Sequence, residues 1–366
     1  MNITHVITGL NQGGAEGALV RLVCQSANPA AHTVISLMDE GIHGAKIRAS
    51  GARVVSLRAR SGGFSISAFH RLIAELRESR PDVVQTWMYH ADLLGGLATK
   101  QLGISVVWGV RMSNNSFRYL GLKTWLVAKA CALLSYFIPS YIVSCSERAI
   151  ALHRKFGYAD RFVYIPNGFN LADLNALIAH SDVHRPPILG HAARLHPIKG
   201  QADFLNALEH LKLCSQDFQA RMAGSDVLAS NPEFSAMIPA AVAEHIEAIG
   251  PQSDMSGFYK TCDVFVLSSH GEAFPNVVAE AMLAGLPCIV TDVGDAAEIV
   301  GDTGWVVPAN NPQALAAAMR QAITAMADTD TWAARKAAAC ARIVRLYSMD
   351  KMQSRFDAAW TAAMEN

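Results

Sequence analysis

The sequence has no excess of charge of either sign. Its 366 residues include 31 Lys and Arg against 31 Asp and Glu, and 51% of them are hydrophobic. A nucleic-acid groove requires a surplus of basic residues, so this balance argues against a nucleic-acid partner. The apolar content indicates globular cores, and at about 150 residues per domain the chain is long enough for two domains.

Cysteines are few and scattered. The sequence has 7, an odd number, and none of them forms a C-x-x-C pair. Such cysteines are typical of small buried residues in a reducing compartment rather than of a disulfide framework. The first residues lack a basic leader and a long apolar run, so we expect no signal peptide and a cytoplasmic location.

Several catalytic and metal-binding signatures are missing as well. The sequence contains no P-loop and no Gly-x-Ser-x-Gly nucleophile elbow. Its one Asp-x-Asp, Asp328 to Asp330, lies between two helical patterns, where Asp normally caps a helix. His180 and His184 have no Cys or carboxylate partner at ligand spacing. We therefore expect no metal site and no bound cofactor.

One segment, 122–143, is apolar enough to be considered as a membrane-spanning or membrane-bound helix. It contains Lys123, Lys129 and Pro139, so it lacks the run of about 18 uncharged residues that a spanning helix needs. Two interpretations stay open. The segment is either a core helix with two solvated lysines or a basic, Trp-containing amphipathic helix that lies on an anionic membrane.

Short apolar runs alternate with helical patterns through both halves of the chain, which predicts α/β architecture with doubly wound parallel sheets. The predicted strands are 3–7, 33–37, 53–57, 82–85, 105–108, 141–144, 162–165, 188–191, 219–223, 246–249, 263–267, 287–290 and 305–307. The predicted helices lie near 15–26, 43–50, 66–78, 91–101, 119–137, 146–156, 201–212, 234–244, 254–260, 275–284, 312–326, 331–346 and 350–364. A break at 165–170 and a polar segment around 180–187 predict a linker between two domains. Two such sheets are expected to place the carboxyl ends of their strands around a shared cleft, where ligands of α/β proteins bind.

The stretch from Ser268 to Met282 is the most informative part of the sequence. It follows an apolar strand and leads into a strong helical pattern, with Pro275 expected at the first helical position. The amides of Asn276 and Val277 would then be donors at a positive helix end, which suits a phosphate. Glu272 and Glu280 bracket this site and are suited to accept hydrogen bonds from hydroxyls of a ribose or another sugar.

Other polar residues also follow predicted strands. Arg194 and Lys199 lie five positions apart on one loop shaped by Pro197 and Gly200. Two cations so placed can hold a diphosphate, the Arg bidentately and the Lys as a point charge, although exposed surface charges are the plain alternative.

In the first half, Gly13 and Gly14 follow the strand 3–7 and would let backbone amides approach a phosphate, or form only a tight turn. His90 follows the strand 82–85, where Trp87 and Tyr89 suggest a wall that contacts a sugar; a purely structural histidine is the alternative. The remaining residues that follow strands are more often caps or turn residues than ligand contacts: Arg111, Asn114, Ser146 and Asn167.

Taken together, four of these features resemble the retaining nucleotide-sugar glycosyltransferases of the GT-B fold, specifically glycosyltransferase family 4. They are Gly13 to Glu16, Ile165 to Gly168, Arg194 with Lys199, and Glu272 with Glu280. The paired glutamates with the Arg/Lys loop are the specific part, and the resemblance covers nearly the whole chain. It implies two Rossmann-like domains that face each other across a cleft. The acceptor-binding domain would be 1–168 with a C-terminal helix 347–366 that crosses back to it, and the donor-binding domain would be 169–346.

The resemblance also implies a role for each candidate residue. The catalytic set would be His90 near the reacting sugar, Arg194 and Lys199 on the departing diphosphate, and Glu272 on the transferred sugar. The donor-binding set would be Gly13, Gly14, Phe274, Asn276, Val277 and Glu280, the last of them on the ribose. Trp87, Tyr89 and Arg111 lie in the half expected to bind the acceptor.

The implied reaction is retaining transfer from a UDP- or GDP-sugar by front-face attack, without a metal. Fixed cations and a helix end would stabilise the leaving diphosphate. The expected acceptor is a saccharide or a lipid-linked saccharide, as in bacterial surface polysaccharide assembly, and the protein would be cytoplasmic or peripheral on the inner membrane. Two alternatives stay open: a UDP-sugar 2-epimerase of the same two-domain architecture, which would need further proton-transfer groups, and a non-catalytic nucleotide-sugar binder.

Overall fold

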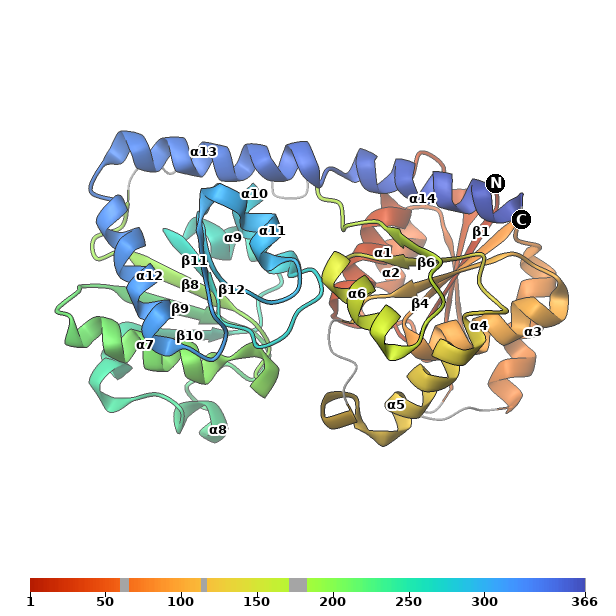
Figure 1. Cartoon of the computed structure of the whole chain (residues 1–366), viewed down its shortest axis with the longest axis horizontal. Helices are drawn as coiled ribbons and strands as arrows, with labels where there is room; N and C mark the ends of the chain where they lie inside the picture. The colour runs from red at the N-terminus through yellow and green to blue at the C-terminus, as the bar shows by residue number, and fades with distance from the viewer. Residues whose placement is uncertain (60–65, 113–116, 171–182, 366) are drawn as a thin grey trace. The chain divides into compact units, whose positions relative to one another are not determined.

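The computed structural model describes residues 1–59, 66–112, 117–170 and 183–365. It divides into two compact units, Met1–Gly168 with Tyr347–Asn366 and Phe169–Leu346. Each unit is a parallel sheet with helices on both faces (Figure 1). Asn114 and His180 lie outside the described residues, as does most of the predicted linker.

The first unit contains a seven-stranded sheet in the order β3-β2-β1-β4-β5-β6-β7, with every pair parallel. The strands are β1 (Ile3–Ile7), β2 (His32–Ser36), β3 (Arg53–Ser56), β4 (Val83–Trp87), β5 (Val106–Val110), β6 (Tyr141–Ser144) and β7 (Phe162–Tyr164). The strand order reverses between β1 and β4, so the loops after these two strands diverge at the carboxyl edge. Open α/β sheets bind ligands at such a switch point.

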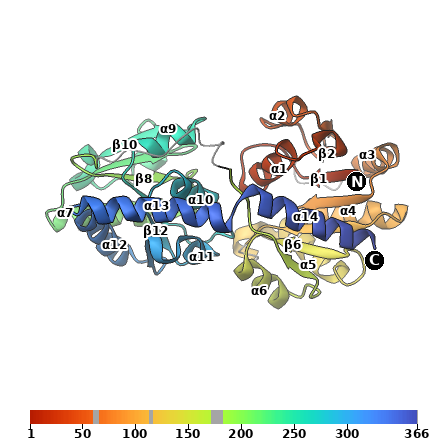
Figure 2. The ribbon, with the colours of Figure 1, turned by 90° about the horizontal axis from the view of Figure 1, so that it is seen from above.

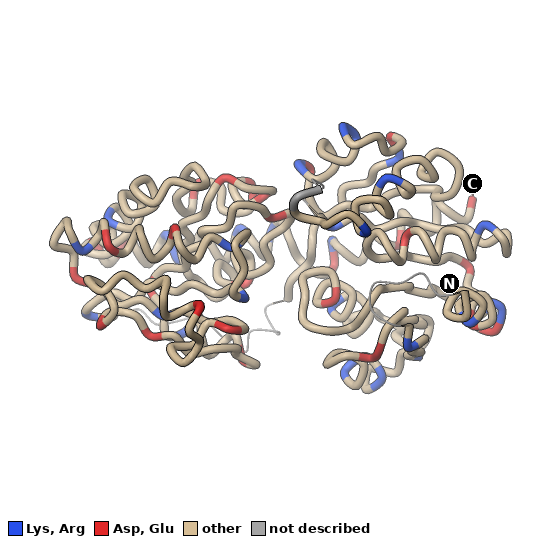
Figure 3. The backbone as a smooth tube through the Cα atoms, turned by 90° about the horizontal axis from the view of Figure 1, so that it is seen from below, with Lys and Arg blue, Asp and Glu red and all other residues tan. Residues whose placement is uncertain are grey.

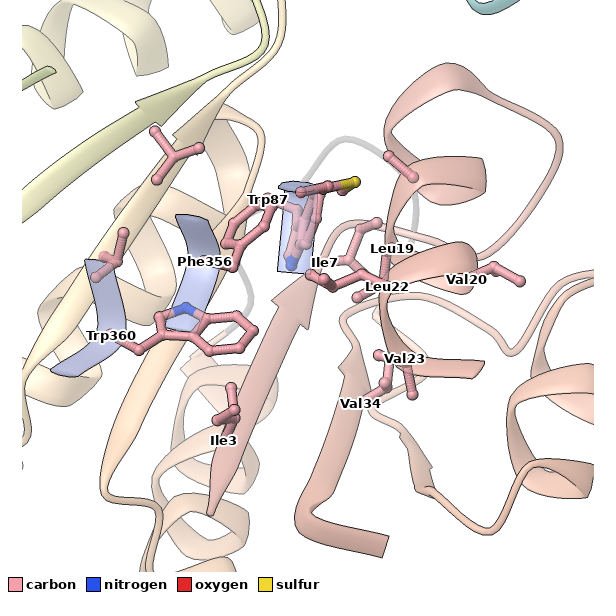
Figure 4. Close-up of a cluster of buried hydrophobic side chains, with 14 of the residues drawn as sticks. Ile3, Ile7, Leu19, Val20, Leu22, Val23, Val34, Trp87, Phe356 and Trp360 are labelled. Carbon is pink, nitrogen blue, oxygen red and sulfur yellow. The ribbon is translucent and has the colours of Figure 1, made fainter. Parts of the chain in front are cut away.

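Helices cover both faces of this sheet. One face carries α1 (Gly14–Cys24), α2 (Gly44–Ala49) and the C-terminal α14 (Met349–Met364); the other carries α3 (Ile66–Ser79), α4 (Tyr89–Leu102), α5 (Phe117–Leu134) and α6 (Glu147–Phe156). Figure 2 shows α14 running along this unit. Phe356 and Trp360 of α14 pack in the same buried cluster as Trp87, Ile7 and Leu19 (Figure 4). The prediction that the last helix returns to the first domain is therefore confirmed.

The second unit contains a six-stranded parallel sheet in the order β10-β9-β8-β11-β12-β13. The strands are β8 (Ile188–Ala192), β9 (Gln219–Ala223), β10 (Ile246–Gly250), β11 (Val264–Leu267), β12 (Cys288–Thr291) and β13 (Trp305–Val307). One face is covered by α7 (Gln201–Leu213) and α12 (Pro312–Ala325), and the other by α9 (Met255–Lys260), α10 (Asn276–Leu283), α11 (Ala296–Val300) and α13 (Thr329–Leu346). Here the order reverses between β8 and β11.

All predicted strands are present, with ends within two residues of the prediction. The predicted helix 234–244 is wrong: α8 (Pro232–Ser235) ends early and a 3-10 segment, Ala240–His245, follows Pro239, which cannot continue a helix. The short α11 was not predicted. The helix predicted at 119–137 ends at Leu134 and is interrupted at Gly121, where φ is +70°.

Candidate functional site

Two loops meet at the switch point of the second sheet. The loop after β8 carries Arg194 and Lys199, and the loop after β11 carries Ser268 to Pro275. Because β8 and β11 pair directly on either side of the reversal, their carboxyl ends are neighbours. Residues that the sequence separates by about seventy positions are thus brought to the ligand-binding edge of one sheet.

Lys199 and Glu272 contact each other at this edge. The Nζ of Lys199 lies 2.6 Å from Oε1 of Glu272, and the two side chains are only 24% and 13% exposed. The hydroxyl of Ser269 donates to the same carboxylate oxygen at 2.8 Å. The cation predicted for a diphosphate and the carboxylate predicted for a sugar therefore form one hydrogen-bonded group.

Two glycines allow the backbone to pack closely around this contact, Gly200 on the loop after β8 and Gly294 on the loop after β12. Gly200 has φ +64°, and a Cβ there would lie 2.0 Å from the carbonyl oxygen of Ser268. Gly294 has φ +51°, and a Cβ there would lie 2.2 Å from the carbonyl oxygen of Glu272. Only glycine fits both positions without displacement. The hydroxyl of Ser268 also donates to the Lys199 carbonyl at 3.1 Å, so the loops are joined through side chain and backbone.

Arg194 is placed differently from Lys199. Its backbone carbonyl accepts a hydrogen bond from Nε2 of Gln201 at 2.7 Å, which fixes the loop. Its side chain is exposed, and no hydrogen bond or ion pair holds its guanidinium within the described residues. Lys199 is therefore fixed in place, whereas the guanidinium of Arg194 is available to a ligand.

Helix α10 begins one residue later than the sequence predicts. Pro275 is the residue before the helix, with φ −72° and ψ 94°, and α10 begins at Asn276. The amide of Val278 already donates to the Pro275 carbonyl at 3.0 Å, so Asn276 and Val277 supply the two amides nearest the loop.

Tyr259 orients the second glutamate, and sequence reasoning missed it. The buried hydroxyl of Tyr259 donates to Oε2 of Glu280 at 3.2 Å and lies 3.3 Å from the Val277 carbonyl. The side chain of Phe274 is also buried and stacks on Phe169 with ring centroids 6.1 Å apart. Tyr259 belongs to the short helix α9, whose sequence carries no recognisable motif, so its contact with Glu280 could be seen only in the packed structure.

In the first unit, Gly13 and Gly14 begin α1 directly after the β1 loop. The carboxylate of Glu16 folds back over them, because a Cβ on Gly13 would lie 2.2 Å from its Oε2. Burial raises the pKa of Glu16. A carboxylate of the protein itself therefore lies at the helix end where the sequence predicts the approach of a phosphate.

His90 lies on the other side of the same switch point, at the second position of α4. It is half-buried, and burial lowers the pKa of its imidazole, which is therefore neutral near pH 7. No hydrogen bond fixes its ring within the described part of the chain. Met88, two residues earlier, has φ +74° and ψ 158°, a strained conformation for a residue with a side chain. Such strain is concentrated at functional sites.

The aromatic wall predicted around His90 is wrong. Tyr89 is 2% exposed, and its hydroxyl pairs with Nε2 of His153 at 2.8 Å. Trp87 is 0% exposed, and its Nε1 donates to Nδ1 of His5 at 3.3 Å. Both rings pack in the core and have their polar atoms satisfied there. A strand-end position alone does not reveal whether a side chain points to the edge or into the core.

The residues predicted to be caps or turn residues fall into two groups. Ser146 is the N-cap of α6 and accepts from the Ala149 amide at 3.1 Å, as expected. Arg111 and Asn167 do something else: both are buried, and Nη1 of Arg111 donates to Oδ1 of Asn167 at 2.5 Å. The guanidinium of Arg111 also lies 4.4 Å from the ring centroid of Trp87.

The described residues contain no group of three or more His, Cys, Asp and Glu side chains that could hold a metal ion. His184 has a carboxylate partner that sequence spacing did not reveal, since its Nδ1 lies 3.1 Å from Asp263, 79 positions away. Asp328 caps α13 by accepting from the Thr331 amide at 3.1 Å, as predicted.

Comparison with known proteins agrees with this arrangement. Residues 12–173 match the family described as Glycosyltransferase Family 4, and residues 186–325 match the family described as Glycosyl transferases group 1. EpsF of Bacillus subtilis is 25% identical over 312 residues, which are 79% of this chain and 79% of EpsF. The UDP-Gal:alpha-D-GlcNAc-diphosphoundecaprenol alpha-1,3-galactosyltransferase of Escherichia coli is 25% identical over 238 residues, which are 60% of this chain and 59% of that enzyme.

Solved structures show the same fold. Anabaena HepE in complex with UDP and glucose superposes with a TM-score of 0.80 at 18% identity, and the match covers 99% of this chain and 100% of HepE. The glycosyltransferase from Rickettsia africae superposes with a TM-score of 0.78 at 19% identity, over 100% of this chain and 99% of that one. The chain belongs to glycosyltransferase family 4 and is a nucleotide-sugar-dependent glycosyltransferase with the GT-B fold.

Proposed function

We propose that this enzyme transfers a hexosyl group from a UDP-sugar to a lipid-linked saccharide, with retention of anomeric configuration and without a metal. The observation that carries this proposal is the Lys199–Glu272 contact at the switch point of the second sheet, beside the first turn of α10. A cation, a carboxylate and a helix end within one group of loops match the diphosphate and sugar of such a donor.

The second unit binds the donor. Lys199 exchanges Glu272 for the diphosphate, and the exposed guanidinium of Arg194 joins it there. Glu272 then accepts hydrogen bonds from hydroxyls of the transferred sugar, and Glu280, held by Tyr259, accepts from the ribose. The backbone from Phe274 to Val277 lies near the sugar and phosphate in this unit, and in the first unit Gly13 and Gly14 allow backbone amides to approach a phosphate. UDP is favoured over GDP because HepE has been solved with UDP-glucose and the Escherichia coli relative is named for UDP-Gal.

The reaction breaks the bond between the anomeric carbon and the phosphate oxygen, and the electron pair leaves with UDP. Lys199, Arg194 and the α10 end stabilise the charge that develops there, which is the work a metal does in other transferases. An acceptor hydroxyl attacks the same face of the sugar, and its proton passes to the departing phosphate oxygen. His90, neutral near pH 7, hydrogen-bonds a hydroxyl of the reacting sugar.

The outer surface of α5 supports a membrane-bound acceptor. Leu122, Leu126, Leu133, Tyr136 and Phe137 are 52% to 67% exposed, and their spacing places them on one side of α5 and the turn after it. We call these five residues the α5 stripe. The opposite side of α5 is also apolar, since Ala128, Cys131 and Ala132 are buried against the rest of the unit. A helix that is apolar on both sides is not typical of a solvated surface.

Charge favours an anionic bilayer as the partner of the α5 stripe. Acidic and basic residues are interspersed over the chain as a whole (Figure 3). Between Asp92 and Glu147, however, the sequence has no Asp or Glu, while it has the following basic residues: Lys100, Arg111, Arg118, Lys123 and Lys129. Exposed aliphatic and aromatic side chains with lysines between them suit the interface of an anionic membrane. No helix in the described ranges is both long and apolar enough to span a bilayer.

The proposal is tested with the full chain, radiolabelled UDP-sugars and a bacterial lipid extract. We expect one UDP-sugar to give labelled lipid together with one equivalent of UDP, and an anomeric proton coupling in the product that matches the donor. Glu272→Ala should abolish transfer. Deuterium from solvent at C2 of the sugar would instead indicate an epimerase, and donor binding without turnover in every extract would indicate a non-catalytic binder.

A further inference from the structure

Arg111 is a buried cation that pairs with no carboxylate among the described residues. Its side chain begins directly after β5, and the residue is only 9% exposed. Its Nη1 donates to Asn167, but its Nε and Nη2 are buried and have no hydrogen-bond partner in the part of the chain that the structure describes. Burying a guanidinium without an anion costs several kcal/mol, on the order of the penalty for a single desolvated ion. Such a group requires an explanation.

The two unpaired donors lie on one edge of the guanidinium. Nε and Nη2 point in the same direction from the planar group and form the fork that binds two oxygens of a phosphate or carboxylate side by side. The remaining nitrogen, Nη1, is the one that Asn167 holds. The protein therefore uses Nη1 of Arg111 for its own structure, and the Nε–Nη2 edge has no partner among the described residues.

The position of this fork is fixed by its neighbours. The guanidinium lies over the ring of Trp87, 4.4 Å from the centroid. The indole is itself held by a hydrogen bond to His5 and by contact with Phe356, with ring centroids 5.9 Å apart. Asn167, which fixes the other side, is 3% exposed. Arg111 is thus preorganised, and a ligand that binds it pays little entropy to order the side chain.

The electrostatic surroundings of Arg111 also favour an added anion. Burial is the main cause that lowers the pKa of Arg111; the neighbouring side chain of Cys145 raises it, and the positive charge of Arg21 on α1 lowers it. No ion pair joins Arg111 to a carboxylate within the described residues. An anion bound to Arg111 would also be attracted by the positive charge of Arg21. Arg111 follows β5, which pairs with β4 at the carboxyl edge of the first sheet.

From these observations we infer that the Nε–Nη2 edge of Arg111, stacked on Trp87 and held by Asn167, binds a phosphoryl group of the acceptor. The inference rests on the proposed function, in which the first unit binds the acceptor. It adds that the acceptor is a phosphorylated saccharide, such as one joined to a lipid through phosphate, and not a neutral glycan. Its sugar hydroxyl reacts while its phosphoryl group stays bound to Arg111 and is chemically unchanged.

Inorganic phosphate is the probe. Because the donor loops also attract phosphate, the parent protein for the titration is the full chain with Arg194→Ala and Lys199→Ala. Isothermal titration at low ionic strength should show one saturable phosphate site. Adding Arg111→Met, which keeps the apolar stem over Trp87, should weaken that site about tenfold or more, the loss expected for two hydrogen bonds to a charged group. Lys123→Met, which removes an exposed cation of the same unit, should leave the affinity unchanged.

Arg111→Lys keeps the charge but not the fork, so it should weaken phosphate binding by at least threefold while the protein stays folded. If Arg111→Met does not fold, Arg111→Lys is used to test the inference. The inference is overturned if the parent protein binds no phosphate, if both Arg111 variants bind it as the parent does, or if acetate binds as tightly as phosphate. A second measurement distinguishes failure of this inference from failure of the proposed function. It is the binding of UDP-glucose to a protein that carries Arg111→Lys and has Arg194 and Lys199 intact. If this protein still binds UDP-glucose, the proposed function is retained even when Arg111 does not bind phosphate.

Discussion

Lys199 and Glu272 form an ion pair, with Nζ and Oε1 2.6 Å apart, at the point where the second sheet reverses its strand order. This contact has a consequence for catalysis. In the proposed function Lys199 neutralises the leaving diphosphate and Glu272 contacts the sugar, so donor binding must separate the pair.

Glu272→Gln should have opposite effects on nucleotide binding and on transfer. UDP alone should bind about fivefold more tightly, because Lys199 no longer has to leave a partly buried ion pair worth roughly 1 kcal/mol. Transfer should fall by about 100-fold, since the sugar loses its charged acceptor. Titration with UDP and initial rates with the UDP-sugar measure the two effects. Arg221→Met, which breaks an exposed pair with Glu247, is the control and should change neither. Weaker UDP binding by Glu272→Gln would contradict the pairing argument.

Tyr259→Phe should raise the KM for the donor and leave kcat nearly unchanged. The substitution keeps the buried ring and removes the hydroxyl that donates to Glu280 at 3.2 Å. Loss of one such hydrogen bond corresponds to a change of about three- to tenfold. Steady-state kinetics with varied UDP-sugar check this result. A large fall in kcat with an unaltered KM would show that Glu280 does not bind the ground-state ribose.

Gly200→Ala should disrupt both folding and activity. Its Cβ would lie 2.0 Å from the Ser268 carbonyl in a backbone conformation with φ +64°, so the loop with Lys199 must move away from β11. We expect a loss of about 2 kcal/mol or more in the free energy of unfolding, together with at least a tenfold fall in kcat/KM. Gly285→Ala is the matched control. Gly285 has φ +80° with no atom within 4 Å of the added Cβ, so only the strain of about 1 kcal/mol remains and activity should persist.

The buried titratable groups described here predict that the free energy of unfolding is greatest near pH 6.5. Burial lowers the pKa of His32, His153 and His191 to about 4. These groups are neutral when folded and charged when unfolded between about pH 4 and 6.5, so stability is lost as the pH falls through that window. Burial raises the pKa of Asp92 to about 8. The folded state therefore keeps a proton that the unfolded state releases, and stability is lost as the pH rises toward 8.

Asp92→Asn tests whether Asp92 causes the expected loss of stability above pH 6.5. Asp92 accepts hydrogen bonds from Thr86 and from the Gly109 amide, and an Asn oxygen can accept both. The free energy of unfolding of the variant should no longer fall between pH 6.5 and 8, whereas that of the parent should fall by roughly 1.4 kcal/mol per pH unit. Urea unfolding at several pH values measures both. Parallel pH profiles for the two proteins would show that Asp92 is ionised in the folded state.

The α5 stripe should bind anionic vesicles. We expect the full chain to float with vesicles that contain phosphatidylglycerol at low salt and to be released as salt is raised, since lysines supply part of the attraction. Leu126→Gln combined with Leu133→Gln should abolish flotation without loss of stability, because both side chains are exposed, at 53% and 67%. Leu213→Gln, on α7 of the second unit and 76% exposed, should float like the parent. Flotation that survives the double substitution would assign the binding to another surface.

The sequence by itself determined the strands, most helices and the family of this protein. Strands such as Ile3–Ile7 are short apolar runs bounded by turn residues, and that signal is local. The same holds for the α10 element, where a buried strand, a Gly/Pro turn and a helical pattern follow one another, with Glu272 and Glu280 fixed on either side. Local signals also located Lys199 and Arg194 at the end of a strand.

Only the tertiary structure decided which of these residues touch. Strand order is not encoded in any one segment, so the pairing of β8 with β11, and with it the contact between Lys199 and Glu272, follows from the packed sheet. The direction of a side chain also depends on packing, which explains why the predicted aromatic wall was wrong. Trp87 is the last residue of β4, and Tyr89 follows the strand as His90 does, but the rings of Trp87 and Tyr89 turn into the core, where His5 and His153 satisfy their polar atoms. Burial likewise left Nε and Nη2 of Arg111 without a hydrogen-bond partner among the described residues, which no local sequence signal predicts.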